Sequence, residues 1–367
     1  MKRTKVLLML IVAAFLMMGI VACTPAEAPT PAAGELTSVR ETEEDTTTDV
    51  PDTNVAEDVD TDPAPFVVEG QKFEIGIIQL TDHPALLAAQ EGFLAALDNY
   101  GVDANIDLQN ALGDRDVLAT IADRFVGNNV DLVLAIATPS VQSMFAASNT
   151  IPIVGTAITS YERAGVVESN NAPGFNVTGA SDMNPIQHQI DMIFEFVPDL
   201  KILGIAYASS EPNAVYQAEI AIEYAESLGL DVRTGTVASV GEVQQNIASL
   251  AANVDAIWIP TDNTHADAMP IVGQVAIETG VPAFAGEDQM TMGGGLATLS
   301  INYFELGFES GRMARDILVN GANPAEMPIR FGMDLDLNYI VNGFMAEELG
   351  IEIPARFADY VWFPEAE

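Results

Sequence analysis

The sequence predicts an α/β protein whose folded part consists of two similar, Rossmann-like lobes with parallel sheets. From residue 73 onward, runs of Ile, Val and Leu alternate with stretches of helical periodicity. The same alternation starts again after an irregular section at 170–179 that is rich in Asn and Gly. With 367 residues, of which 49% are hydrophobic and 18% charged, the chain is too long for one small domain and able to bury a large core.

The first series of elements predicts one parallel sheet. Its nearly continuous apolar runs are typical of strands that are buried on both faces, and strands that alternate with helices of this length form right-handed βαβ units. The predicted strands are 73–79, 102–109, 131–137 and 151–155, and the predicted helices are 84–100, 114–127 and 139–148.

The second series repeats this order and predicts a second lobe. Its predicted helices are 185–196, 212–228, 241–253 and 263–280, and its predicted strands are 201–207, 231–237, 255–260 and 282–285. A strand at 296–301 and a helix at 303–320 follow, and the remaining tail shows little periodicity. Since ligands bind beyond the carboxyl ends of the strands in open α/β sheets, two facing lobes predict a binding cleft and a hinge that closes it.

The beginning of the chain predicts an exported, lipid-anchored protein. Lys2, Arg3 and Lys5 precede an uncharged apolar run at 6–21, which is shorter than a membrane-spanning helix requires. The only cysteine, Cys23, ends this run, and the arrangement resembles a bacterial lipobox. This resemblance implies a signal peptide at 1–22, cleavage before Cys23 and lipid attachment to it. The alternative is a weak transmembrane helix with an incidental buried cysteine.

The composition changes abruptly after the cysteine. Residues 24–70 are rich in Thr, Pro, Ala, Asp and Glu, and they lack apolar periodicity. Such a segment cannot bury enough apolar surface to offset the entropy of ordering. We therefore expect residues 23–70 to form the lipidated cysteine and a disordered acidic linker that holds the folded part away from the membrane.

Charge and composition exclude several classes of function. The chain has 14 Lys and Arg against 53 Asp and Glu, and a formal net charge of −39 argues against nucleic acid as a partner. Beyond residue 70 the only lysines are Lys72 and Lys201, so the acidity extends over the folded part, and we interpret it as a solvation adaptation.

The single cysteine excludes a disulfide framework, and the three histidines lack metal-ligand spacing. No nucleophile elbow or phosphate-binding loop is present, so we expect neither an enzyme nor a cofactor or metal.

Five blocks of sequence, in this order, resemble those of substrate-binding lipoproteins of ABC importers, in the group for tryptophan- and tyrosine-type substrates. They are IGIIQLTDHPAL at 75–86, VDLVLAIATP at 130–139, NVTGASD at 176–182, VDAIWIPTDNT at 254–264 and LATLSINYFELG at 296–307. The resemblance covers about residues 73–330. It implies the fold of type I periplasmic binding proteins, with two lobes joined by a multi-strand hinge.

The resemblance also implies an organisation and partners. By the usual crossings of this fold, the first lobe is 73–178 plus 299–325, and the second is 179–298 plus 326–358. The protein is expected to act as a monomer outside the cytoplasm, to bind a small solute and to deliver it to a membrane permease.

Candidate ligand-binding residues of the first lobe follow its strands. Thr138 is expected to cap the helix that starts at Pro139, where Thr138 or Ser140 can also hydrogen-bond a ligand carboxylate. The same geometry suggests Gln79, His83 and Thr156. For each of these residues, ordinary capping or a simple turn is the alternative.

Candidate residues of the second lobe include a carboxylate for a ligand ammonium, since an unpaired charge in a closed cleft is very costly. The candidates are Asp182, Asp262 and Asp288, each just beyond a strand or crossing. Asp262 is also placed to cap the next helix, so Asp288 is the first choice, with Glu287 as its nearest rival.

Other side chains are expected to complete the second half of the site. Asn213 and Asn263 offer amides, and Tyr207 and Tyr303 are positioned to stack on an aromatic ligand. Trp258 lies inside a strand and is expected in the core, while His188 and His265 are expected on helix surfaces.

Two functions are consistent with these features. The first is an importer subunit that captures a small solute, preferably an aromatic or apolar amino acid, in the cleft between the lobes by hinge closure. The second is a sensor in which the same module presents a solute to a membrane receptor.

Overall fold

The computed structural model describes residues 71–335 and 337–364. The predicted signal peptide, the lipidation site Cys23 and the acidic linker lie outside the described residues. Within the described part of the chain, no helix is both long enough and apolar enough to cross a membrane.

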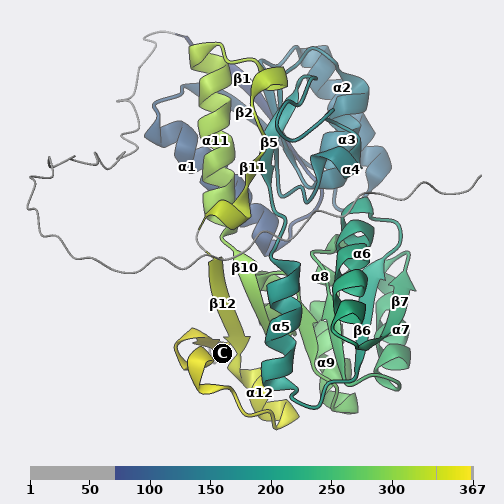
Figure 1. Cartoon of the computed structure of the whole chain (residues 1–367). Coiled ribbons are helices and arrows are strands. Elements are labelled where there is room, and N and C mark those ends of the chain that lie inside the picture. Colours follow the sequence, from purple (N-terminus) through teal and green to yellow (C-terminus); the bar gives the residue numbers. More distant parts are fainter. Residues whose placement is uncertain (1–70, 336, 365–367) are drawn as a thin grey trace, which may run out of the picture. The chain divides into compact units, whose positions relative to one another are not determined.

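The first lobe is built on a parallel sheet of six strands in the order β11-β5-β4-β3-β1-β2 (Figure 1). The strands are β1 Phe73–Gln79, β2 Ala104–Asn110, β3 Leu132–Ile136, β4 Ile153–Thr156, β5 Val177–Ser181 and β11 Arg330–Phe331. The helices are α1 Pro84–Asn99, α2 Arg115–Asn128, α3 Thr138–Ala147, α4 Tyr161–Ala164 and α11 Tyr303–Asn320, followed by a short 3-10 turn at Pro324–Glu326. Because β1 lies between β2 and β3, the strand order reverses at β1 and β3, where such sheets bind ligands.

The second lobe contains a parallel sheet of four strands in the order β7-β6-β8-β9. These strands are β6 Ile202–Ala208, β7 Asp231–Val237, β8 Ala256–Ile259 and β9 Ala283–Ala285. The helices are α5 Ile186–Phe196, α6 Pro212–Ser227, α7 Val243–Ala251, α8 Asn263–Ala266, α9 Met269–Thr279, α10 Asp288–Gly293 and α12 Gly343–Leu349. A 3-10 turn at Val240–Glu242 precedes α7.

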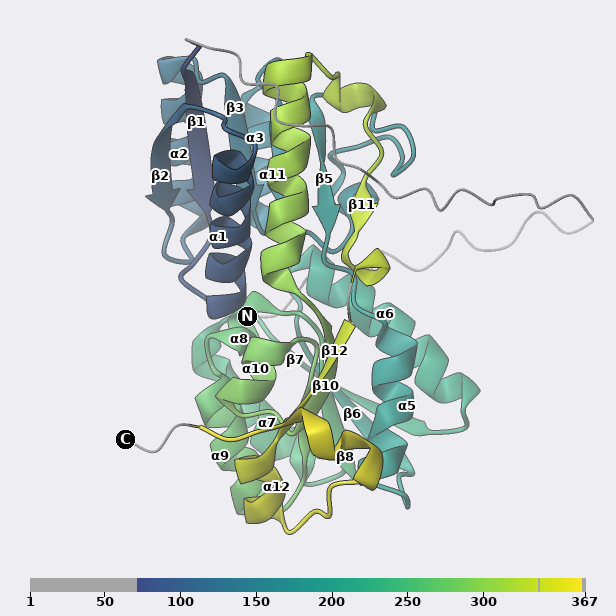
Figure 2. The ribbon, with the colours of Figure 1, turned by 90° about the vertical axis from the view of Figure 1, so that its left-hand side faces the viewer.

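A third, small sheet links the end of the chain to the second lobe. Its strands β10 Ala297–Ile301, β12 Leu337–Asn342 and β13 Val361–Trp362 lie in the order β10-β12-β13, with β10 and β12 antiparallel (Figure 2). Two 3-10 turns, Gly332–Asp334 and Ala355–Tyr360, complete this part of the chain.

The α/β prediction and its strand–helix order are confirmed, with differences in three places. The single helix expected at 263–280 is divided into α8 and α9. The short elements β5, α4 and α10 were not predicted, and the tail beyond 320 contains β11, β12, β13 and α12. These elements are short or rich in Gly and polar residues, so they carry little hydrophobic periodicity.

Two separate hydrophobic cores define the lobes. The first core includes residues of β1, β3 and α11, and the second includes residues of β6, β8 and α9. Trp258 is fully buried in the second core, as expected. Ile329 belongs to the first core and β11 pairs with β5, so residues 329–331 lie with the first lobe rather than with the second, where the expected boundary at 326 places them.

Helices α1 and α11 contact each other through their backbones. A Cβ atom at Gly307 of α11 would lie 1.8 Å from the carbonyl oxygen of Ala89, and one at Gly92 of α1 would lie 1.9 Å from the carbonyl oxygen of Phe304. Only glycine permits this approach. The contact fixes α11, which starts at Tyr303, against the first lobe.

We predict that Gly307→Ala destabilises the protein by at least about 2 kcal/mol, because the added methyl group meets a backbone atom that cannot move aside. Gly127→Ala is the matched control, since Gly127 lies in α2 and a Cβ atom there would have no other atom within 4 Å. It should be neutral or stabilise by up to about 1 kcal/mol. Urea unfolding of both variants checks this, and equal effects would contradict the close helix contact.

Candidate functional site

A cavity with about 380 Å³ of free space, part of it open to solvent, lies where residues of both cores meet. It is lined by His83, Ala85, Leu86, Thr138, Ala157, Asp182, Asn213, Thr261, Asp262, Asn263, Ala266, Glu287, Met290 and Tyr303. Most of these residues follow the carboxyl end of a strand or begin a helix. The cavity therefore occupies the position at which open α/β sheets bind ligands.

Two alanines beside the cavity have strained backbones. Ala137 follows β3 with φ +77°, and Ala157 follows β4 with φ +54°. Non-glycine residues adopt positive φ rarely and at a cost, and such residues cluster at functional sites. Here the conformation lets the chain turn sharply from each strand end into the wall of the cavity.

Thr138 does not cap its helix as expected. Ala137 is the N-cap of α3, no side chain caps it, and Thr138 is the first helical residue. The capping role is lost because Ala137 already makes the turn with its positive φ. Thr138 instead lines the cavity, and the buried Ser140 hydroxyl lies further along the same turn.

Asp182 is a buried carboxylate with an unused acceptor. It follows β5 in the connection to the second lobe, and the Tyr303 hydroxyl donates to its Oδ2 at 3.2 Å. Its Oδ1 has no hydrogen-bond partner. Burial raises the pKa of Asp182 to about 6, and the nearby hydroxyls of Thr159 and then Tyr303 offset only part of this shift.

Glu287 and His83 face each other from the two lobes. The His83 Nε2 lies 3.8 Å from the Glu287 Oε1. Burial lowers the pKa of His83 to about 4, so the imidazole is neutral at pH 7. Burial, and next the nearby Asp288, hold the pKa of Glu287 well above its usual range, so this contact is not an ordinary ion pair.

Glu287 rather than Asp288 reaches the cavity. Glu287 caps α10 by accepting from the amides of Gln289 and Met290, and it lines the cavity at the same time. Asp288 is partly exposed, accepts from the amide of Gln289, and is not among the lining residues. Asp288, our first choice for the ammonium partner, is therefore not part of the cavity lining, whereas its rival Glu287 is.

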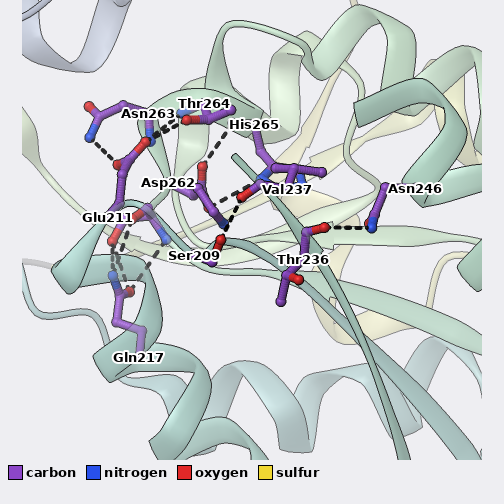
Figure 3. A network of polar contacts seen from close by, with 12 residues as sticks. Ser209, Glu211, Gln217, Thr236, Val237, Asn246, Asp262, Asn263, Thr264 and His265 are labelled. Atoms are coloured by element: carbon purple, nitrogen blue, oxygen red, sulfur yellow. Dashed lines mark hydrogen bonds and ion pairs between the residues drawn. The ribbon is translucent and has the colours of Figure 1, made fainter. Parts of the chain in front are cut away.

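A second polar network surrounds the start of α8 (Figure 3). Asp262 accepts from the amides of His265 and Ala208, so its expected capping role is present. Glu211 accepts four hydrogen bonds, from the backbone amides and the side chains of Asn263 and Thr264. Burial and then the neighbouring Asp262 raise the pKa of Glu211. These carboxylates occupy the amides that a ligand anion would otherwise use.

His265 is not on a helix surface as expected. It is fully buried, and its Nδ1 lies 3.1 Å from the Asp262 Oδ2. The four-residue helix α8 packs against β6, α9 and α10 of the second lobe, so the imidazole is covered. His188 of α5, by contrast, is exposed as expected.

Several buried polar atoms near the cavity lack partners. Among them are oxygen atoms of residues from both lobes: Gln79 Oε1, Ser140 Oγ, Thr156 Oγ1, Asp182 Oδ1 and Asn213 Oδ1. Buried polar groups are nearly always hydrogen-bonded in native proteins, and each exception requires an explanation. Asp182 and Asn213 line the cavity directly, so both acceptors are accessible to a polar ligand.

The structure brings together some of the predicted ligand-binding residues. His83, Thr138, Asp182, Asn213, Asp262 and Asn263 line the cavity, as does Tyr303. Gln79, Ser140, Thr156, Tyr207 and Asp288 are not among the lining residues. The first three of these are buried beside the strand ends, whereas Tyr207 packs at the edge of the second core.

Some residues of the cavity lining and of the neighbouring polar network were not predicted from the sequence. Glu211 lies between β6 and α6, and nothing in the sequence indicated a role for it beyond this position. The following Pro212 marks only the start of the helix. Ala157 and Met290 are apolar and resemble core residues in the sequence. Thr261 was recognisable in principle, since it follows β8 at a strand end.

Comparisons with known proteins give a consistent result. The family described as ABC transporter substrate binding protein matches residues 74–361. A curated relative from Clostridioides difficile, described as a tyrosine-binding protein, is 37% identical over 259 residues, which are 70% of this chain and 75% of the relative.

Two solved structures are similar over 80% of this chain. An ABC domain in complex with L-Trp from Streptococcus pneumonia is 35% identical, with a TM-score of 0.76 over 99% of its own length. A ligand-free, open substrate binding protein with adhesive properties from Clostridium difficile is 36% identical, with a TM-score of 0.64 over its whole length. The fold is that of type I periplasmic binding proteins, as expected.

We predict that Asp182→Asn stabilises the ligand-free protein. Since the pKa of Asp182 rises from 3.8 to about 6 on folding, ionisation of this group opposes folding above pH 6 and has no effect below pH 4. The variant should gain up to about 3 kcal/mol in unfolding free energy at pH 7.5. Chemical denaturation at pH 7.5 and pH 4 checks this: the gain must fall below about 1 kcal/mol at pH 4, and a loss of stability at pH 7.5 would contradict it.

Proposed function

We propose that this chain, which belongs to the family of ABC transporter substrate binding proteins, captures an amino acid with an aromatic or apolar side chain between its lobes and delivers it to a membrane permease. The observation that carries this proposal is the cavity lined from both cores, in which Asp182 Oδ1 and Asn213 Oδ1 have no partner.

The lining of the cavity suits the two ends of such a ligand. Asp182 offers a carboxylate oxygen to an ammonium group, and Thr138 at the start of α3 offers a hydroxyl to a carboxylate. Leu86, Met290 and the ring of Tyr303 form an apolar part of the wall. An aromatic or apolar side chain packs favourably there.

The relatives support an aromatic amino acid. One is described as tyrosine-binding, and the structure from Streptococcus pneumonia holds L-Trp. Each is more than a third identical to this chain and covers most of it. We therefore place tyrosine, tryptophan and phenylalanine first among the expected ligands.

We propose that binding closes the lobes about a hinge. The chain passes between the lobes after β5, between β10 and α11, and again after β11. Contacts across the cleft include the ion pair of Arg163 with Glu219 at 2.6 Å and the hydrogen bond of Arg115 to the Ser210 carbonyl at 3.0 Å. At nearly equal identity and coverage, the chain superposes better on the L-Trp complex than on the open, ligand-free protein, which supports a closed arrangement.

The proposal also includes the setting of the protein. We propose a monomer outside the cytoplasm that is anchored by lipid on Cys23, presents the closed form to the permease and performs no catalysis. The amino-terminal charge pattern and the position of the only cysteine support the anchor.

We predict that tyrosine, tryptophan or phenylalanine raises the melting temperature by several degrees at a ligand concentration of about 100 times Kd, which corresponds to about 2.7 kcal/mol of stabilisation. A thermal-shift screen of amino acids, nucleosides and vitamins checks this. Stabilisation by nucleosides or vitamins alone would refute an amino acid ligand.

We predict that the best amino acid from this screen reduces the radius of gyration of the protein in small-angle X-ray scattering, because the lobes close around it. Wild type with a non-binding amino acid is the control. Tight binding with an unchanged radius of gyration in wild type would contradict hinge closure.

A further inference from the structure

We propose that the cavity selects its ligand by the primary ammonium group, through Asp182, and that the ligand carboxylate is dispensable, so that aromatic amines form a second class of ligand. This inference rests on the proposed function, because it concerns recognition in the same cavity.

The charged side chains around the cavity carry one sign. Among the described residues that line it, Asp182, Asp262 and Glu287 are acidic, and none is Lys or Arg. The one basic residue, His83, is neutral at pH 7 because burial lowers its pKa to about 4. Arg115 lines the neighbouring outer groove instead, where it donates to the Ser210 carbonyl.

The hydrogen bonds of these carboxylates single out Asp182. Both oxygens of Asp262 accept backbone amides, from His265 and Ala208. Both oxygens of Glu287 accept backbone amides at the start of α10. Asp182 Oδ1 alone among these six oxygens has no partner, and Asp182 is only 5% exposed. A ligand ammonium at Oδ1 forms a charge-assisted hydrogen bond and removes the penalty of an uncompensated buried carboxylate.

A ligand carboxylate meets a different environment. The lining offers it the hydroxyl of Thr138 at the start of α3, but no cation. The Thr261 hydroxyl already donates to Gln217, and Asn213 Nδ2 donates to the Thr261 carbonyl. At the start of α8, the amides of Asn263 and Thr264 already bind Glu211. A second negative charge in this cavity therefore gains neutral hydrogen bonds only and is repelled by Asp182. Its loss should affect affinity much less than the loss of the ammonium.

Tyr303 links the carboxylate of Asp182 to a second connection between the lobes. Its hydroxyl donates to Asp182 Oδ2, Asp182 lies in the connection that follows β5, and Tyr303 is the first residue of α11 after β10. The carboxylate that binds the ammonium is thus positioned by a residue from a second connection between the lobes. A deaminated ligand makes no charged contact there.

The experiment is isothermal titration calorimetry of the full chain with matched sets of compounds at pH 7.5. One set is tyrosine, tyramine and the deaminated arylpropionate of tyrosine, and the other set is the corresponding three compounds of tryptophan. We expect each amine to bind within about tenfold of its amino acid, because only neutral hydrogen bonds are lost. Each arylpropionate should bind at least a hundredfold more weakly.

Two substitutions assign the ammonium partner. Asp182→Asn keeps the size of the side chain and its acceptor for Tyr303, and it should weaken amine and amino acid alike by at least a hundredfold. Its expected higher stability shows that such a loss is not a failure to fold. If Asp288→Asn rather than Asp182→Asn has this effect, the assignment to Asp182 is wrong.

The binding profile separates this inference from the proposed function. Amino acids that bind while their amines bind more than a hundredfold more weakly overturn the inference and leave the function intact. An arylpropionate that binds as tightly as its amino acid also overturns it. Amines that bind while amino acids do not support the inference and refute amino acid capture, and binding by none of the compounds overturns both.

Discussion

The site depends on one uncompensated charge, the buried carboxylate of Asp182. The Tyr303 hydroxyl donates to its Oδ2, and Oδ1 has no hydrogen-bond partner. An ionised carboxylate in this position opposes folding until a cation reaches it. Asp182 and Tyr303 both lie in connections between the lobes, so this charge is located at the junction of the two lobes. This charge lowers the stability of the ligand-free protein, and a cation that neutralises it binds more tightly by the same free energy.

The other groups around the cavity limit which charged groups a ligand can carry. The carboxylates of Glu211 and Glu287 occupy the amides at the starts of α8 and α10, whereas no side chain caps α3. These two helix starts of the second lobe are therefore not available to a ligand anion, whereas the start of α3 in the first lobe offers neutral donors. The positive φ angles at Ala137 and Ala157 lie at the turns next to this part of the cavity wall.

Much of the fold could be predicted from the sequence, because apolar runs such as 131–137 and the repeated strand–helix order are strong signals. The tail was not predictable in this way, since β12 begins with exposed and half-buried residues. The strand ends indicated at which edge of each sheet the site lies, but not which side chains line it. Glu287 and Asp288 are adjacent in sequence, and only the direction in which α10 starts decides which reaches the cavity. Strain at two alanines leaves no sequence signal, because glycine usually marks such turns.

The backbone contact between α1 and α11 has a consequence for the order of folding. Residues 303–320 and 330–331 complete the first lobe, yet they follow the whole four-stranded parallel sheet of the second lobe in the chain. During synthesis the first sheet therefore lacks a covering helix and its edge strand β11 until nearly the entire chain is available. Contacts between segments so distant in sequence form slowly. The first lobe, although earlier in sequence, therefore cannot be completed before the parallel sheet of the second lobe has been synthesised.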